Sequence, residues 1–226
     1  MKKIISLIFL ICFDLKADDF VVCIHGFLGG KWCMSYLEKN LLEDGWNVIN
    51  WDYPSRDDTI QNHGEKLVYS LKELAEKNPG RPIHFVAHSM GSLVLLAALN
   101  HPKTPMEAKI GRVVLIAPPL KGSLWARWLS QFEIIRKILK EYSGKELMTE
   151  TNYFQLFGNY PETIDKILVI AGSLGFNPIL EGENDGTIAV SETILNTPHE
   201  HITVKSGHKT IVFNTTVSNI TRAFLN

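Results

Sequence analysis

The stretch from residue 83 to residue 99 constrains the fold more strongly than any other part of this 226-residue sequence. Residues 83–87 form a mostly apolar run, which breaks at residues 88–91 (HSMG) and resumes over residues 92–99 with the spacing of a buried helix. This pattern predicts a buried strand, a sharp turn and a buried helix in direct succession.

Ser89 occupies the sharp turn of this stretch. In a tight strand-to-helix turn the serine backbone is strained, its Oγ projects from the edge of the sheet, and the positive N-terminal end of the helix faces it. The sequence Ala87-His88-Ser89-Met90-Gly91 thus corresponds to a Gly-x-Ser-x-Gly nucleophile elbow with Ala87 in place of the first glycine. The alternative is a serine that caps an ordinary helix after an ordinary strand.

Apolar runs and helical patterns alternate along most of the chain. The segments with strand character are residues 20–24, 46–51, 83–87, 112–117, 166–173 and 202–205, and the clearest helical ones between and after them are residues 32–44, 61–78 and 210–225. Such alternation predicts parallel strands joined by crossover helices. We therefore expect an α/β fold in one domain, residues 18–226, with about six mostly parallel strands and helices on both faces.

A glycine-rich loop, HGFLGG, follows the first strand at residues 25–30. Three glycines in six residues indicate a backbone that turns tightly and leaves its N–H groups open. In an acyl-transfer site, the N–H of Phe27 would be one donor to a developing oxyanion, and the N–H of Met90, which follows the serine, would be the second. A flexible connection between strand and helix is the alternative.

Asp185 and His208 each follow a predicted strand, in the chain order Ser, Asp, His. Because catalytic groups of a parallel sheet gather at the carboxyl ends of its strands, we expect Ser89, Asp185 and His208 to meet there. His208 would take the serine proton as general base, and Asp185 would orient the imidazole and stabilise its charged form. Glu183 is a second candidate for the acid, and Asp52, which follows a strand before the elbow, is a weaker one.

The remaining histidines and acidic residues suggest no metal site. The loop at residues 181–190 has acidic residues between glycines, but it lacks the regular ligand alternation of a calcium loop. His199 and His201 would share one face of a strand without a third ligand, so we expect surface residues there rather than zinc ligands. His25 and His88 flank the candidate site and are expected to be structural or to line a pocket.

Residues 120–161 interrupt the regular alternation. A broad apolar face between residues 124 and 139 predicts a helix, and an irregular stretch follows it. The segment is either a small helical cap or lid that faces the substrate, or a crossover helix that covers the sheet.

The N-terminus differs in composition from the rest of the chain. Two lysines precede the apolar residues 4–13, and polar residues follow. This pattern predicts a secretory signal peptide over residues 1–17, with cleavage after Ala17, and hence a secreted or periplasmic protein. The alternative is an uncleaved N-terminus that anchors the chain to a membrane. Cys23 and Cys33 would remain after cleavage, either as a disulfide pair or as two free thiols.

Charge is nearly balanced, with 23 basic and 24 acidic residues and no block of Lys or Arg. We therefore expect no nucleic-acid partner. The oligomeric state stays open.

From about residue 20 to residue 224 the sequence resembles a small α/β-hydrolase, and its Ala-x-Ser-x-Gly elbow matches the variant of small Bacillus-type secreted lipases. Residues 53–56 (YPSR), 117–119 (APP) and 185–190 (DGTIAV) are similar to stretches of a broad group of bacterial lipase-like hydrolases. The segment after Leu120 is longer than in the smallest lipases.

The resemblance implies an α/β-hydrolase fold and lipase or esterase activity on a small-molecule or lipid acyl ester, without a cofactor. It assigns the triad to Ser89, Asp185 and His208 and the oxyanion donors to Phe27 and Met90. Peripheral contact with a membrane or lipid surface is expected with such substrates. Two other functions stay open, an acyltransferase or thioesterase with the same triad, and an inactive binding protein on the hydrolase scaffold.

Overall fold

The computed structural model describes residues 19–135, 142–149 and 156–226. The predicted signal peptide, residues 1–17, lies outside the described residues, as do residues 136–141 and 150–155 of the cap region, the name used here for residues 120–161.

Six strands form one sheet in which every neighbouring pair is parallel. The spatial order is β2-β1-β3-β4-β5-β6, and the bounds are β1 Phe20–Ile24, β2 Asn47–Trp51, β3 Ile83–His88, β4 Val113–Ile116, β5 Ile167–Gly172 and β6 Glu200–Val204. The central strands β3, β4 and β5 are buried along their whole length, which explains why their sequences are continuously apolar rather than alternating. The predicted α/β fold with about six strands is confirmed.

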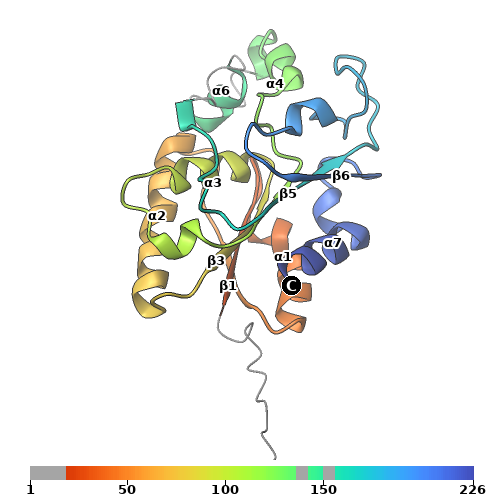
Figure 1. The fold of residues 1–226 in the computed structure, drawn as a ribbon. Coiled ribbons are helices and arrows are strands. Elements are labelled where there is room, and N and C mark those ends of the chain that lie inside the picture. The colour runs from red at the N-terminus through yellow and green to blue at the C-terminus, as the bar shows by residue number, and fades with distance from the viewer. Residues whose placement is uncertain (1–18, 136–141, 150–155) are drawn as a thin grey trace, which may run out of the picture.

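Helices cover both faces of the sheet (Figure 1). On one side, α2 (Ile60–Lys77) and α3 (Met90–Leu99) bury one apolar cluster, and on the other α1 (Lys31–Glu43) and α7 (Thr215–Leu225) bury a second. All ten residues of α3 are buried, because this helix is wedged between the sheet and α2. The strands and their loops are thus held from two sides by packed apolar side chains.

Two predicted elements near the C-terminus differ from the structure. The last strand begins at Glu200 rather than residue 202. The apolar pattern did not mark its first residues, which are polar because β6 is an edge strand. The predicted closing helix, residues 210–225, is divided into a 3₁₀ turn at Ile211–Phe213 and α7. Asn214 separates them, because its Oδ1 accepts hydrogen bonds from the N–H groups of Thr216 (2.8 Å) and Val217 (3.3 Å) and so begins a new helix.

The cap region contains short helices instead of the one helix predicted between residues 124 and 139. Its described parts include α4 (Leu124–Leu129) and α6 (Ser143–Leu147), which lie at the end of the molecule where the strands terminate (Figure 1). The Glu192 carboxylate holds the start of α4, because it accepts hydrogen bonds from the N–H groups of Leu124 (2.7 Å) and Ala189 (2.8 Å). Two further 3₁₀ turns, Met106–Lys109 and Val190–Thr193, were not predicted.

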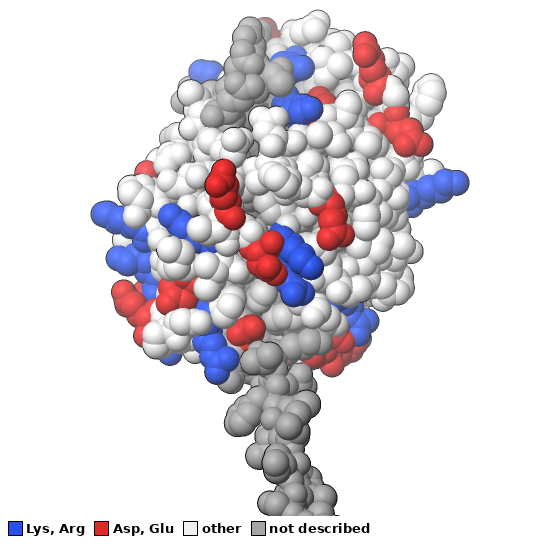
Figure 2. All heavy atoms as spheres, in the orientation of Figure 1, with Lys and Arg blue, Asp and Glu red and all other residues white. Residues whose placement is uncertain are grey.

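Surface features agree with the balanced composition. On the face shown in Figure 2, acidic and basic side chains are interspersed. Within the described ranges, no helix has both the length and the apolar character needed to cross a membrane. Cys23 is buried in β1 and Cys33 is partly buried in α1, and both are free thiols.

Buried neutral histidines should make the fold sensitive to acid. Burial and the nearby Lys66 ammonium lower the pKa of His63 from 6.5 to about 4. Since the unfolded chain binds a proton near pH 6.5 and the folded chain does so only near pH 4, the free energy of unfolding falls as the pH drops through this window, by up to about 1.4 kcal/mol per pH unit. Burial lowers the pKa values of His84 and His88 in the same direction.

Urea unfolding at several pH values between 4 and 7.5 tests this sensitivity. His63→Phe, which retains a ring against Tyr53 without a titratable group, should flatten the dependence of unfolding free energy on pH. Identical pH profiles for wild type and variant would show that His63 does not contribute to acid sensitivity.

Candidate active site

Ser89 lies at the junction between β3 and α3 in a strained conformation, with φ 51° and ψ −127°. A positive φ is unfavourable for a residue with a side chain, and a hydrogen bond from the Ser89 N–H to the carbonyl oxygen of Ile116 (2.9 Å) helps to hold it. The structure also explains why the motif ends in a glycine, Gly91. A Cβ at residue 91 would lie 2.6 Å from the His25 carbonyl oxygen and 2.7 Å from that of Ile24, so α3 approaches β1 closely only with glycine there.

Ser89, His208 and Asp185 form a continuous hydrogen-bonded line. His208 Nε2 lies 2.9 Å from Ser89 Oγ, and His208 Nδ1 lies 2.7 Å from Asp185 Oδ2. Because a carboxylate can only accept, the proton resides on Nδ1, and Nε2 of the neutral ring is left to accept the hydroxyl proton of Ser89. The side chain of Asp185 is 1% exposed and that of His208 is 12% exposed, so the carboxylate is shielded while the imidazole reaches the surface of the site.

The Asp185 carboxylate is fixed by its own loop. Its Oδ1 accepts hydrogen bonds from the N–H groups of Thr187 (2.9 Å) and Ile188 (2.7 Å), which leaves Oδ2 facing His208. The His208 N–H donates to the Asp185 carbonyl oxygen at 2.9 Å, so backbone and side chain both join these two loops. The acid and the imidazole are therefore positioned before any substrate arrives.

Neither alternative acid hydrogen-bonds His208 within the described structure. Glu183 is exposed on the loop that carries Asp185. Asp52 instead accepts a hydrogen bond from the Lys31 N–H (3.1 Å) and lies 3.3 Å from His25 Nε2. Of the three carboxylates considered from the sequence, Asp185 is the one that reaches the imidazole.

The glycine-rich loop turns sharply beside Ser89. A Cβ at Gly26 would lie 2.9 Å from Ser89 Cβ, so the loop touches the serine only because residue 26 has no side chain. Leu28 is left-handed, with φ 59°. Among the described residues, no hydrogen bond uses the N–H of Phe27 or that of Met90, the first residue of α3. The structure thus brings both predicted donors to the neighbourhood of Ser89.

His88 and His25 support the backbone around the site, as expected for structural histidines. Burial, together with the nearby His208, lowers the pKa of His88 to about 3, so this ring is neutral and its Nε2–H donates to the His208 carbonyl oxygen at 3.1 Å. His25 is fully buried, and its Nδ1–H donates to the Gly26 carbonyl oxygen at 2.9 Å. One ring therefore steadies the loop of the imidazole and the other steadies the glycine-rich loop.

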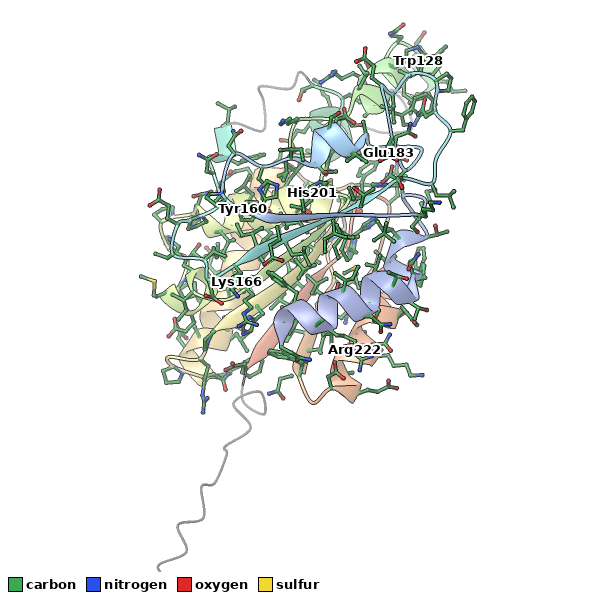
Figure 3. All side chains as sticks on the ribbon, turned by 45° about the vertical axis from the view of Figure 1, so that its right-hand side comes forward. Trp128, Tyr160, Lys166, Glu183, His201 and Arg222 are labelled. Carbon is green, nitrogen blue, oxygen red and sulfur yellow. The ribbon has the colours of Figure 1, made fainter. Side chains whose placement is uncertain are left out.

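His199 and His201 are occupied elsewhere. His201, labelled on β6 in Figure 3, has its Nε2 2.9 Å from the Thr193 hydroxyl, and His199 Nδ1 lies 2.8 Å from the Thr197 carbonyl oxygen. In the part of the chain that the structure covers, no three His, Cys, Asp or Glu side chains are grouped as metal ligands.

A pocket of about 280 Å³ opens beside Ser89 and His208. Its lining is mostly apolar and comes from the glycine-rich loop, α4, α6 and the loop after Asp185; it includes Phe27, Trp125, Leu129, Leu147, Met148 and Ile188. Trp125 stacks on Trp128, with ring centroids 5.0 Å apart, and Figure 3 shows Trp128 at the end of the molecule above the strands. The described parts of the cap region thus form a wall of the pocket.

A model of the alpha/beta hydrolase family matches residues 21–173. The chain belongs to the alpha/beta hydrolase family. A comparison of the chain with curated protein sequences found no match.

Solved structures share its fold. The mature form of the Bacillus licheniformis lipase BlEst2 has a TM-score of 0.75 and 20% sequence identity, with 93% of each chain covered. The Pyrococcus furiosus esterase Pf2001 has a TM-score of 0.61 and 20% identity, with 94% of this chain and 84% of that chain covered. Aspergillus fumigatus lipase B has a TM-score of 0.66 and 13% identity, with 95% of this chain and 54% of that chain covered.

The sequence analysis did not identify two groups that support the site. The Tyr53 hydroxyl donates to the His25 carbonyl oxygen at 2.8 Å, and the Ser55 hydroxyl accepts a hydrogen bond from the Leu28 N–H at 3.1 Å. The similarity of residues 53–56 to other hydrolases singled out this segment, but no local pattern shows that it touches the glycine-rich loop.

Proposed function

We propose that this protein is a serine hydrolase that cleaves carboxylic esters through an acyl-enzyme. The observation that carries the proposal is the hydrogen-bonded line from Ser89 through His208 to Asp185 at the mouth of an apolar pocket. A nucleophile, a base within hydrogen-bond reach and a group that orients the base are the parts that this chemistry requires.

The first half of the reaction transfers the acyl group to the protein. Ser89 Oγ attacks the ester carbonyl carbon while His208 Nε2 takes the hydroxyl proton. The carbonyl π electrons move to oxygen, and the N–H groups of Phe27 and Met90 donate to that oxyanion. When the oxyanion collapses, the bond to the alcohol oxygen breaks, His208 returns the proton to the leaving alkoxide, and an alcohol departs.

The second half regenerates Ser89. Water attacks the acyl-enzyme as His208 takes one of its protons, a second oxyanion forms and collapses, and the serine oxygen leaves with the proton that His208 returns. The products are a carboxylic acid and the free serine. All protons and electron pairs move among these residues, the substrate and water, so the proposed reaction needs no cofactor.

Apolar acyl groups are the proposed substrates. The pocket beside Ser89 is lined mainly by apolar side chains, and solved structures with this fold include a lipase and an esterase. Its volume of about 280 Å³ is at the small end for ligand pockets, which favours short and medium acyl chains over long ones.

A panel of p-nitrophenyl esters from acetyl to palmitoyl tests the proposal with the purified full chain. We expect hydrolysis with an optimum below the longest chains, and covalent labelling by a fluorophosphonate probe. Folded protein that cleaves none of these esters and resists the probe would contradict the proposal and favour a binding role. Product analysis with added alcohols and with acyl thioesters distinguishes hydrolase, acyltransferase and thioesterase.

Filling the pocket should change chain-length preference. Met148 lines the pocket from the end of α6, so Met148→Trp should lower kcat/KM for an octanoyl ester by about 10-fold or more while acetyl ester hydrolysis stays within about twofold. Met148→Leu, which nearly conserves volume, is the control. An unchanged preference in the Trp variant would place the acyl chain elsewhere.

The proposal includes peripheral contact with a lipid surface. Leu28, Leu174 and Phe176 are 53%, 65% and 95% exposed, and each follows the carboxyl end of a strand, the edge at which Ser89 lies. Exposed apolar groups at one edge suit contact with a lipid phase. Sedimentation with phosphatidylcholine vesicles tests this part, and protein that stays wholly in the supernatant would contradict it.

We also propose export of the protein through a signal peptide at residues 1–17. The support is the charged and apolar pattern of the sequence there. N-terminal sequencing of the protein from the periplasm or medium of an expressing cell should begin at Asp18, whereas a chain that keeps its N-terminus and sediments with membranes would support the anchor.

A further inference from the structure

The segment after β2 braces the glycine-rich loop from one side. Ser55 is 4% exposed, and its hydroxyl oxygen accepts a hydrogen bond from the Leu28 N–H at 3.1 Å. Leu28 has the left-handed φ of 59°, which is unfavourable for a residue with a side chain and therefore needs external support. Within the described structure, the Ser55 hydroxyl is the acceptor for the Leu28 N–H.

A second residue of the same segment braces the other end of the loop. The ring of Tyr53 stacks on that of His25 with centroids 4.3 Å apart, and its hydroxyl donates to the His25 carbonyl oxygen at 2.8 Å. Residues 26 and 27 thus lie between two held positions, His25 and Leu28. The N–H of Phe27, the proposed oxyanion donor, shares its peptide with the Gly26 carbonyl, whose oxygen accepts hydrogen bonds from His25 Nδ1–H (2.9 Å) and from the Gly29 N–H (3.1 Å). The direction of this N–H therefore depends on where His25 and residues 28 and 29 are held.

Ser55 is itself held by the cap region. Its carbonyl oxygen accepts a hydrogen bond from the hydroxyl of Ser143 at 2.5 Å, and Ser143 is fully buried at the start of α6. The two polar groups of Ser55 therefore have separate roles, since the carbonyl joins the cap region and the hydroxyl joins the glycine-rich loop.

We propose that Ser55 is a positioning residue for the oxyanion site, and that its hydroxyl keeps Leu28 left-handed and thereby aims the Phe27 N–H at the substrate oxygen. This inference rests on the proposed serine-hydrolase function. Oxyanion donors act because they are oriented before charge develops, so a donor that must first be turned loses much of its effect on the transition state and little on substrate binding.

Ser55→Ala tests the proposal in the full chain. We expect kcat for p-nitrophenyl butyrate to fall by roughly 10- to 100-fold with KM within about twofold, because complete loss of one donor lowers kcat by about 100- to 1,000-fold. An alkyl trifluoromethyl ketone, whose hemiketal oxyanion with Ser89 occupies the same donors, should lose affinity by the same factor as kcat/KM. Ser55→Thr retains the hydroxyl and should restore most of the rate.

Ser143→Ala is the matched control. Ser143→Ala removes a buried hydroxyl hydrogen bond to the Ser55 carbonyl and leaves the bond between Ser55 and Leu28 intact. The midpoint temperature of thermal unfolding should therefore fall in both Ser143→Ala and Ser55→Ala, whereas only Ser55→Ala should weaken ketone binding. Leu28→Pro removes the same hydrogen bond from its donor side, because proline has no N–H and cannot adopt a positive φ. Leu28 is 53% exposed, so the substitution buries no new side chain. It should lower kcat at least as strongly as Ser55→Ala.

The outcomes separate this inference from the proposed function. Wild-type protein without esterase activity or fluorophosphonate labelling would overturn both. Active wild type with a folded Ser55→Ala or Leu28→Pro variant that keeps kcat and ketone affinity within twofold would overturn the role of Ser55 alone.

Discussion

Ser89→Ala should lower kcat for p-nitrophenyl esters by about a million-fold, with the fold intact. The variant loses the only oxygen that lies 2.9 Å from His208 Nε2 in the described site, so no acyl-enzyme can form. Since the substitution removes one small atom from a residue that is 9% exposed, thermal unfolding should change little. Initial rates, labelling with a fluorophosphonate and circular dichroism of the same preparations measure these effects.

Ser92→Ala is the matched control for this prediction. Ser92 lies one turn further along the same elbow, is fully buried and has only a long hydrogen bond of 3.4 Å from its hydroxyl to the Ala87 carbonyl oxygen. It should keep both activity and labelling. If Ser89→Ala retained activity within tenfold and still reacted with the probe, another nucleophile would have to be sought.

Asp185→Asn should lower kcat by about 10,000-fold. The N–H groups of Thr187 and Ile188 both donate to Oδ1, and they would hold the amide oxygen of the asparagine in that place. The amide nitrogen would then face His208 Nδ1, which could only accept. The ring proton would be moved to Nε2, where it prevents His208 from taking the proton of Ser89.

Glu183→Gln is the control for the acid. Glu183 lies on the same loop and is exposed, so its loss of charge should leave kcat within about twofold. Because the expected loss in Asp185→Asn comes from the wrong tautomer, kcat should recover in part at high pH, where hydroxide can take the proton that His208 no longer accepts. A severe loss in Glu183→Gln together with an active Asp185→Asn would reverse the assignment.

Much of the fold was predictable because the information is local. The strand, turn and helix around Ser89 are encoded within residues 83–99, and the buried strands β1, β3, β4 and β5 each correspond to a short, mostly apolar run. The start of the closing helix could also have been predicted from neighbouring residues. Asn214 is a typical N-cap residue, and its position would have moved the start of the closing helix to Thr215.

The cap region was harder to predict. An apolar face between residues 124 and 139 describes amphipathicity but not length, and α4 ends at Leu129. Its start is held by Glu192, 68 residues away in the chain, and α6 is held by Ser55, 88 residues from Ser143. Contacts of this kind depend on how distant loops meet above the sheet, which periodicity does not encode.

The sequence alone was sufficient for the architecture, the candidate nucleophile and the order of Ser89, Asp185 and His208, because strand patterns, a glycine-flanked turn and the parallel-sheet rule each act over a few residues. Tertiary structure decided which carboxylate lies beside the imidazole and which ring nitrogen of His208 lies beside a serine 119 residues away. It also decided which buried hydroxyl supports Leu28. The physical reason is range. A hydrogen bond extends about 3 Å, so it is set by the close packing of loops that only the folded sheet brings together.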